Sequence, residues 1–170
     1  QGRSHGAGPA RSPQLGGHRY PRPMTEHVTP DPTHILQAFD GAPDTPVVML
    51  NLNRYRDTAV YEPDHPFAAR GLSGREAYLH YGVVAQAAIA HVGGRILWAA
   101  DAHEVVIGCD HDRYDEVVAV WYPSRGAFLS LPTYPGYDEA HVHREAAVEQ
   151  ATLLAVDGGA EPVLRNPFEV

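Results

Sequence analysis

The sequence has no lysine and only one cysteine, and both shortages narrow what the chain can do. All 13 basic residues are arginine, so Schiff-base catalysis and covalent attachment of pyridoxal phosphate, which need a lysine amine, are excluded. Cys109 has no second cysteine with which to form an internal disulfide or a multi-cysteine zinc site. A reduced, cytoplasmic location is therefore expected, and the lysine-free, arginine- and proline-rich composition suggests a bacterial gene of high GC content.

Other absences exclude classes of partner. No stretch approaches the roughly 20 apolar residues of a membrane helix. The net charge of −8 disfavours nonspecific binding to nucleic acid or to anionic membranes, because like charges repel. The sequence has no phosphate-binding loop, dinucleotide fingerprint or Gly-x-Ser-x-Gly motif. We expect no nucleic-acid or membrane partner and no bound organic cofactor.

What is present fits about one globular domain in 170 residues. Residues 1–30 are rich in Gly, Pro, Arg and His and nearly lack aliphatic side chains, so they are expected to form a flexible tail. Within them, residues 1–23 are interpreted as sequence upstream of a start at Met24. The folded domain is expected over residues 31–156, followed by a tail over 157–170.

Apolar periodicity and end signals predict the order of helices and strands. The clearest helix begins at Ser73, where Glu76 completes a capping box, and stops at Gly93 and Gly94. The predicted helices cover residues 33–39, 73–92, 124–131 and 137–150. The predicted strands cover residues 47–53, 95–100, 104–108, 116–122 and 152–156.

This order of elements predicts a split ferredoxin-like α+β fold, with one antiparallel sheet and helices on one face. The strand over residues 116–122 is apolar on both faces, since Val117 and Ala119 alternate with Val118 and Val120. A sheet with helices on one side only needs a second cover for its other apolar face. A second copy of the sheet supplies one, so we expect a homodimer that closes into a two-sheet barrel.

A Tyr-Pro-Ser-Arg run ends at Arg125, and a Met-Leu-Asn-Leu run begins at Met49. Together with further positions, these runs resemble the domain-of-unknown-function family 1330, which belongs to the dimeric α+β barrel superfamily. The further positions are Arg54, Tyr78, Tyr81, Gly93–Arg95, Val106–Gly108, Trp121, Phe128, Tyr137, His143 and Arg144. The resemblance covers about residues 47–156, and the Tyr-Pro-Ser-Arg run is its most specific part, followed by the Met-Leu-Asn-Leu run.

The resemblance implies a ferredoxin-like fold, a barrel-forming dimer and a pocket between sheet and helices. It implies no single reaction, because the superfamily includes monooxygenases, isomerases, cyclases, haem enzymes and ligand-binding regulators. The chain departs from the family pattern in its N-terminal extension, in a longer loop at residues 57–72, and at Asn53, where a hydrophobic residue is more usual.

Arg144 is the strongest candidate for a functional charge. In a helix over residues 137–150 it falls on the apolar stripe of Tyr137 and Ala140, where an unpaired charge is costly. It either forms a structural ion pair or binds a ligand carboxylate or enolate through its planar fork.

Three further polar residues lie at or near strand ends. Arg125 follows Ser124 and could bind an anion, or Ser124 could cap the helix and leave Arg125 solvated. Asn51 lies in an otherwise apolar strand, where it either orients a substrate carbonyl or pins a neighbouring backbone. Arg54 is either a cation at the rim of the site or solvated.

Aromatic residues offer hydroxyls and walls. The hydroxyl of Tyr81 or of Tyr122 could donate to an oxyanion or act as an acid, although such tyrosines are commonly core residues with a satisfied hydroxyl. Trp98 could wall an aromatic pocket or simply pack in the core.

Two histidines, His80 and His141, are the candidates for a general base, because an unperturbed imidazole titrates near neutrality. His141 and Glu145 have the spacing of helical metal ligands, but the spacings define no third ligand. No metal site is therefore assigned.

These observations favour a small-molecule enzyme that performs acid–base or oxygen chemistry without a cofactor on a small organic, aromatic or polyketide-like substrate. The activities considered are those of a cyclase, an isomerase or a monooxygenase. The alternative is a non-catalytic ligand-binding or accessory protein with the same pocket, and a metal-dependent enzyme is a weaker one. The catalytic candidates are His80, His141, Tyr122 and Arg144. The substrate-binding candidates are Asn51, Arg54, Tyr81, Trp98 and Arg125.

Overall fold

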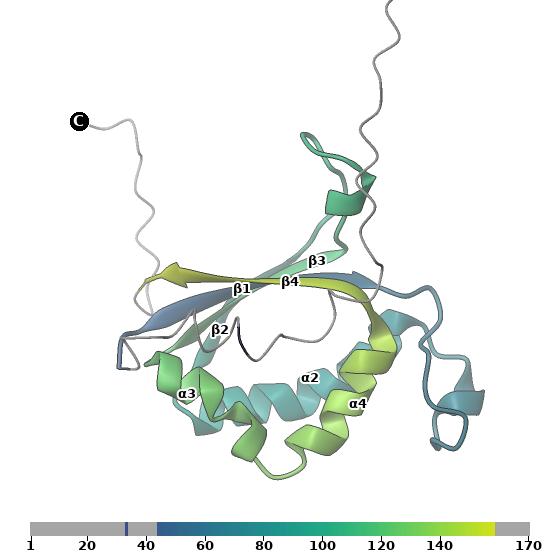
Figure 1. Cartoon of the computed structure of the whole chain (residues 1–170), viewed down its shortest axis with the longest axis horizontal. Coiled ribbons are helices and arrows are strands. Elements are labelled where there is room, and N and C mark those ends of the chain that lie inside the picture. Colours follow the sequence, from purple (N-terminus) through teal and green to yellow (C-terminus); the bar gives the residue numbers. More distant parts are fainter. Residues whose placement is uncertain (1–32, 34–43, 159–170) are drawn as a thin grey trace, which may run out of the picture.

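A computed structural model describes residue 33 and residues 44–158 of the chain. Within these residues, a four-stranded sheet carries its helices on one face (Figure 1). Thr33 lies in a helix, but the rest of the predicted helix 33–39 and both predicted tails, apart from residues 157 and 158, lie outside the described residues.

The elements follow the predicted ferredoxin-like order. Their bounds are β1 Val47–Tyr55, η1 Ala68–Arg70, α2 Gly74–His91, β2 Arg95–Asp101, η2 Asp110–Asp112, β3 Glu116–Tyr122, α3 Arg125–Leu129, η3 Leu131–Thr133, α4 Tyr137–Ala147 and β4 Val148–Asp157. The sheet order is β2-β3-β1-β4, and all three neighbouring pairs are antiparallel. This topology confirms the split βαβ arrangement predicted from the sequence.

The face of the sheet toward the helices holds the main core. Val47 and Met49 of β1 are buried against Ala88 and Ile89 of α2. Tyr122 of β3 joins the same cluster. Because side chains alternate along a strand, every second residue of β1 faces this layer, including Asn51, Asn53 and Tyr55.

The opposite face carries no helix and is apolar. Register pairs Leu50 of β1 with Ala119 of β3 and Leu154 of β4, so these three residues share that face. Trp98 of β2 pairs with Ala119 and joins them. Leu154 is 47% exposed and Trp98 is 44% exposed. The prediction that the strands are apolar on both faces is therefore confirmed.

Local capping explains where α2 begins and ends. The Ser73 hydroxyl accepts the backbone N–H of Glu76, and the Glu76 carboxylate accepts the backbone N–H of Ser73, as the capping-box pattern predicts. At the other end Gly93 has φ +79°, a left-handed conformation that glycine adopts without steric cost. Both predicted helix boundaries hold to within a residue.

Four predicted elements differ in the structure. Residues 104–108 form no strand: Val106 and Ile107 are 88% and 95% exposed in a loop that Asp112 closes by accepting the backbone N–H of Cys109 at 2.9 Å. The helix predicted over 137–150 ends at Ala147, because Val148 is extended and pairs with β1. The strand predicted over 152–156 is therefore longer and begins at Val148. The helix predicted over 124–131 divides into α3 and η3.

Candidate functional site

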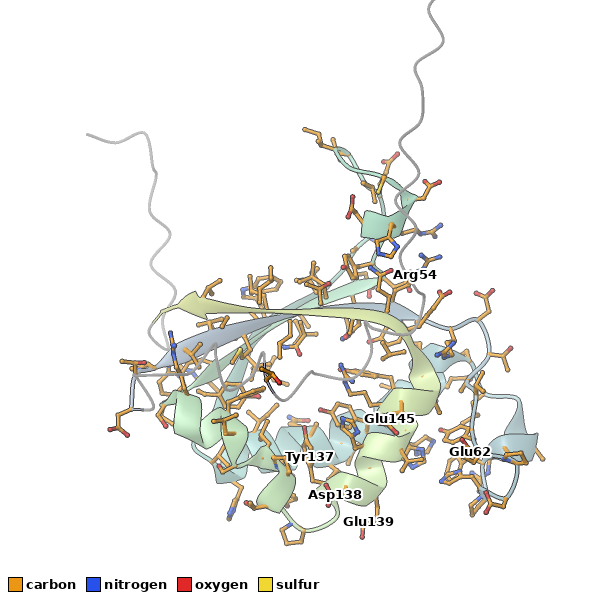
Figure 2. All side chains as sticks on the ribbon, in the orientation of Figure 1. Arg54, Glu62, Tyr137, Asp138, Glu139 and Glu145 are labelled. Carbon is orange, nitrogen blue, oxygen red and sulfur yellow. The ribbon has the colours of Figure 1, made fainter. Side chains whose placement is uncertain are left out.

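Four tyrosines meet between the sheet and the helices. Tyr78 and Tyr81 come from α2, Tyr122 from the end of β3, and Tyr137 from the start of α4. Tyr122 and Tyr137 are buried, and Tyr78 and Tyr81 are half-buried. Figure 2 shows Asp138 and Glu139 on the side of α4 turned away from the sheet, whereas Tyr137 turns toward the interior. We call Tyr78, Tyr81, Tyr122 and Tyr137 the tyrosine cluster.

Hydrogen bonds link this cluster to itself and to β1. The hydroxyl oxygens of Tyr81 and Tyr137 lie 3.0 Å apart. The Asn53 amide donates to the Tyr78 hydroxyl at 3.3 Å, and Asn53 is only 1% exposed. The rings of Tyr78 and Tyr81 pack with centroids 5.3 Å apart. A polar path therefore runs from the sheet across α2 to α4.

Asn51 takes the backbone-pinning role among its two interpretations. Its amide nitrogen lies 3.3 Å from the carbonyl oxygen of Met49 and 3.4 Å from that of Val118 on β3. Both contacts are near the outer limit for a hydrogen bond. Asn51 shares the helix-side face of Met49. Its role in orienting a substrate carbonyl stays a prediction.

Helix α4 adds a base and a cation to the cluster. The rings of His141 and Tyr81 lie 6.1 Å apart edge to face, and those of His141 and Tyr137 lie 6.2 Å apart. Burial lowers the pKa of His141, and the positive charge of Arg144 lowers it further, while Glu145 and Asp138 oppose the shift. His141 is therefore a neutral imidazole at neutral pH, able to accept a proton.

The tyrosine hydroxyls keep their protons in this layer. Burial raises the pKa of Tyr78, Tyr122 and Tyr137 well above the ordinary value. Arg144 opposes that rise at Tyr78 and Tyr137, which puts its guanidinium within electrostatic reach of both. The site thus combines protonated hydroxyl donors, a neutral imidazole and a cation.

Three predicted site residues lie away from the tyrosine cluster. Arg54 points to the helix-free side of β1, and its Nε lies 3.1 Å from a carboxylate oxygen of Glu149. Trp98 lies on the helix-free face, on the far side of the sheet from the tyrosines. His80 is exposed on α2 and contacts Phe67 and His143.

Arg125 takes the first position of α3, at the end of β3. Ser124 caps this helix, since its hydroxyl accepts the backbone N–H of Ala127 at 3.0 Å. The backbone N–H of Arg125 donates to the carbonyl of Thr45 at 3.0 Å. Ser124 therefore caps the helix, but Arg125 is half-buried and its Nε is buried, so the prediction that it is solvated is wrong. Anion binding by Arg125 stays a prediction.

Sequence reasoning omitted Asn53, Tyr78 and Tyr137 from the candidate site. Asn53 could have been found by strand alternation, which puts it on the same face as Met49 and Asn51. Tyr78 and Tyr137 each lie on the stripe that turns a helix toward the sheet, where a hydroxyl needs a partner.

A second aromatic group surrounds His80. The Tyr61 hydroxyl lies 2.8 Å from Nδ1 of His143, and the rings of Tyr61 and His65 stack with centroids 4.7 Å apart. Phe67 packs against both His80 and His143. Burial lowers the pKa of His143, and the neighbouring imidazoles of His80 and His65 add to the shift. This group anchors the loop 57–72 to α2 and α4.

Two searches of the described residues give negative findings. Across residue 33 and residues 44–158, no three His, Cys, Asp or Glu side chains are grouped so that they could hold a metal ion. In the same part of the chain, no helix has the length and apolar character needed to cross a membrane.

Comparison with known proteins places the chain beside an uncharacterised group. The sequence model of a domain of unknown function (DUF1330) matches residues 69–159. The crystal structure of the methylated RPA0582 protein is 34% identical and has a TM-score of 0.70, covering 79% of this chain and 96% of its own. A structure of the RPA0582 protein of unknown function from Rhodopseudomonas palustris is 31% identical, with a TM-score of 0.68, covering 80% of this chain and 98% of its own. The search of curated proteins found no match.

Proposed function

The chain belongs to the DUF1330 family, and we propose that it is an enzyme that performs acid–base chemistry on a small organic acid bound between the sheet and the helices. One observation carries the proposal: the ring of His141 lies 6.1 Å from that of Tyr81 and 6.2 Å from that of Tyr137, whose hydroxyl oxygens are 3.0 Å apart. The charge of Arg144 acts on both His141 and Tyr137. A base, two hydroxyl donors and a cation therefore surround one region. That set matches the needs of proton removal beside a carbonyl group.

Each group has a distinct role in the proposed reaction. Neutral His141 removes a proton from the carbon next to a carbonyl, and the electron pair moves onto the carbonyl oxygen to form an enolate. Arg144 and the Tyr137 hydroxyl stabilise that oxyanion, and return of the proton from His141 to carbon or oxygen completes an isomerisation. The aromatic lining favours a substrate with a ring or a polyketide-like chain.

Phenylpyruvate is a suitable first probe, because it combines a carboxylate, an enolisable carbon and an aromatic ring. We expect the protein to accelerate exchange of its C3 protons in D₂O, measured by ¹H NMR. His141→Gln should slow that exchange by about 10²–10⁴-fold, the usual contribution of a general base, while ligand-induced shifts persist. Arg144→Met should weaken the binding itself.

Arg70→Met is the matched control, since it removes one exposed arginine from η1, outside the cluster. It should exchange protons at the rate of the unaltered chain. A panel of 2-oxo acids and 1,3-diketones extends the test, with native mass spectrometry to detect co-purified ligand. Equal binding and turnover by the unaltered chain and Arg144→Met would remove Arg144 from the mechanism.

A non-catalytic ligand-binding protein is the second candidate, and a specific observation favours it. The hydroxyls of Tyr81 and Tyr137 pair with each other, and the Asn53 amide is paired with Tyr78. Groups that satisfy one another need no substrate for their hydrogen bonds. Binding of the same acids with no proton exchange in any condition would select this candidate.

We also propose that two copies pack through the helix-free face. Leu154, Val156 and Trp98 on that face are all more than a third exposed. Burying them against a second copy is favourable in proportion to the apolar area removed from water. The resulting homodimer would be the two-sheet barrel that the family resemblance implies, and sedimentation velocity over a concentration series would detect it.

A cytoplasmic, bacterial setting belongs to the same proposal. Cys109 is exposed and free, and an exposed thiol is best preserved in a reducing compartment. The arginine-rich, lysine-free composition supports a bacterial gene of high GC content.

A further inference from the structure

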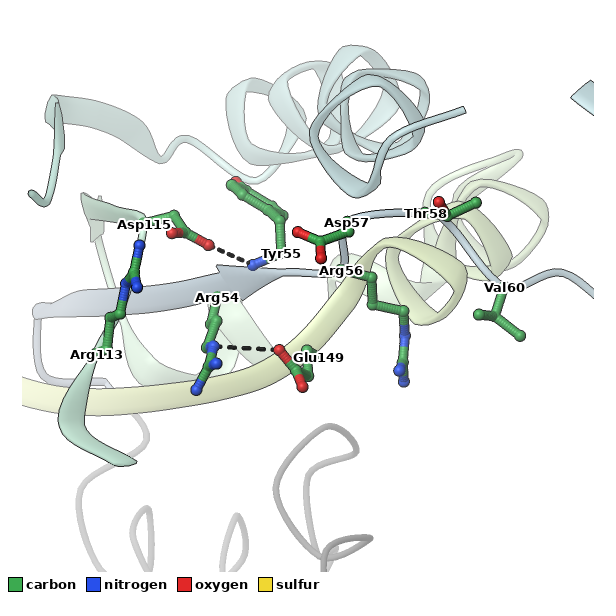
Figure 3. Close-up of a pocket in the computed structure, with 9 residues that line it drawn as sticks. All are labelled: Arg54, Tyr55, Arg56, Asp57, Thr58, Val60, Arg113, Asp115 and Glu149. Carbon is green, nitrogen blue, oxygen red and sulfur yellow. Dashed lines mark hydrogen bonds and ion pairs between the residues drawn. The ribbon is translucent and has the colours of Figure 1, made fainter. Parts of the chain in front are cut away.

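A cleft of about 430 Å³ lies at the end of β1, away from the tyrosine cluster. Three arginines and three acidic residues line it, together with Tyr55, Thr58 and Val60 (Figure 3). The arginines are Arg54, Arg56 and Arg113, and the acids are Asp57, Asp115 and Glu149. We call this the arginine cleft, and its formal charges balance before any pairing is considered.

Two of the three carboxylates are already engaged. Glu149 lies 3.1 Å from Nε of Arg54. Asp115 accepts the backbone N–H of Tyr55 at 2.8 Å. Asp57 is exposed at the rim. Within the described residues, Arg54 is therefore the one arginine of the cleft with a carboxylate at ion-pair distance.

The other two arginines of the cleft are Arg56 and Arg113. Within the described residues neither side chain has a carboxylate at ion-pair distance, and Nε of Arg56 is buried without a hydrogen-bond partner. An arginine cannot shed its charge, so a buried guanidinium N–H without a partner is a standing cost to the fold. An oxyanion in the cleft would relieve that cost.

The backbone holds these arginines in place. The N–H of Arg56 donates to the carbonyl of Ala147 at 2.9 Å, and its own carbonyl accepts the N–H of Gly74 at 2.9 Å. A Cβ on Gly74 would lie 2.5 Å from both carbonyl oxygens, so the start of α2 fits tightly against this segment. A site on such a rigid frame loses little entropy when a ligand binds.

Arg113 is exposed at the other side of the cleft, and the segment that follows it is fixed by backbone hydrogen bonds. Asp115, two residues later, donates its N–H to the carbonyl of Asn53 at 2.8 Å and accepts the N–H of Ala102 at 2.9 Å. Figure 3 shows Arg54 and Arg56 pointing the same way on either side of Glu149, with Arg113 beyond Arg54. Arg56 and Arg113, the two arginines without an ion pair among the described residues, thus lie at opposite ends of the cleft, with the Arg54–Glu149 pair between them.

We propose that the arginine cleft binds a small dianion with an acidic group at each end, one held by Arg56 and the other by Arg113. Guanidinium groups bind carboxylate or phosphate oxygens through two parallel hydrogen bonds, which suits either acid. This site is separate from the tyrosine cluster and does not depend on the reaction proposed there.

Isothermal titration of the full chain at low ionic strength tests the proposal, with succinate, acetate and inorganic phosphate as probes. We expect succinate to bind more tightly than acetate, because succinate has a second carboxylate for the second arginine. Phosphate tighter than succinate would identify a phosphate-bearing ligand rather than a dicarboxylate. Equal affinity for succinate and acetate would overturn the two-ended geometry.

Variants locate the binding. Arg56→Met and Arg113→Met should each raise the dissociation constant of the tightest probe by about tenfold or more, the usual loss for a charge-assisted hydrogen bond. Arg56→Lys keeps the charge without the fork and should lose less. Asp57→Asn removes a competing negative charge at the rim and should tighten binding, which a variant that merely unfolds could not do.

Arg70→Met is again the control, because it removes the same charge from another part of the surface. It should bind each probe within about twofold of the unaltered chain. Equal losses in Arg70→Met and Arg56→Met would show that only net charge matters. No heat and no amide shifts over residues 54–60 at about 10 mM of every probe would also overturn the proposal.

Discussion

The helix side of the sheet buries polar side chains, whereas the helix-free side exposes apolar ones. On the helix side Asn53 is 1% exposed, with the Tyr78 hydroxyl on its amide. On the helix-free side Leu154 is 47% exposed and Trp98 is 44% exposed. A single folded chain gains nothing from either arrangement, because burying polar groups and exposing apolar ones both cost free energy.

We infer from this difference that the two faces serve different purposes. Polar groups that could have been replaced by leucine are kept in the buried layer, which favours a ligand or a reaction there. Apolar groups that could have been polar are kept on the open face, which favours a protein partner.

The largest effect is expected on the open face. Leu154→Arg puts a charge where the second copy is proposed to pack, so the dimer should dissociate in sedimentation velocity, with at least about a tenfold rise in its dissociation constant. Val83→Arg, at a 73% exposed position on α2, is the control and should leave association unchanged. A monomer at all concentrations in the unaltered chain would show that the open face has another purpose.

The next effect concerns buried polarity on the helix side. Asn53→Ala leaves the buried Tyr78 hydroxyl without its partner and should lower the free energy of unfolding by about 1–3 kcal/mol, measured by urea denaturation. Combining it with Tyr78→Phe should recover part of that loss, since both partners are then removed.

The matched comparison is Thr152 on the opposite face. Its hydroxyl pairs with that of Tyr114, and both residues are half-buried, whereas Asn53 is 1% exposed. Water can therefore replace the contact of Thr152 more readily. Thr152→Ala should therefore lose less stability than Asn53→Ala. A larger loss of stability in Thr152→Ala than in Asn53→Ala would contradict the inference that buried polar contacts matter more on the helix side of the sheet.

The smallest effect is a shift in the titration of His141. Arg144→Met removes one of the two causes that lower the pKa of His141, so that pKa should rise toward the ordinary value in an NMR titration. Glu145→Gln should move it the other way, because Glu145 raises it. His143 is an internal control, since His80 and His65 rather than Arg144 add to its burial shift.

The same shift has a consequence for stability. A histidine whose folded pKa lies below its unfolded pKa of about 6.5 binds more protons when unfolded, so stability falls as pH drops below that value. Arg144→Met should make this fall shallower. If Arg144→Met changed neither the pH dependence of stability nor the pKa of His141, Arg144 would not belong to the site.

Local signals in the sequence predicted some elements well. The Ser73–Glu76 box and Gly93 set the ends of α2, because a cap depends only on residues within one turn. Alternation over residues 117–122 predicted a strand with two apolar faces for the same reason. Arg144 was singled out because a charge on an apolar stripe is visible in the sequence.

Other features depended on distant contacts. The apolar run within residues 104–108 predicts a strand, but these residues form a loop before β3 in which Val106 and Ile107 are exposed. Helical periodicity continues past Ala147, yet Val148 pairs with Tyr55 and ends the helix. His80 is predicted to serve as a base, but it packs against Phe67 of the loop 57–72 rather than within the tyrosine cluster.

The sequence by itself determined the order of elements, the caps of α2 and the apolar character of both sheet faces, because period and capping are local properties. Only the tertiary structure decided that Asn53 meets Tyr78, that Tyr81 meets Tyr137, and that Arg56 and Arg113 share a cleft. These contacts join residues from separate elements, and they depend on how those elements pack. The spacing of residues along the chain does not determine that packing.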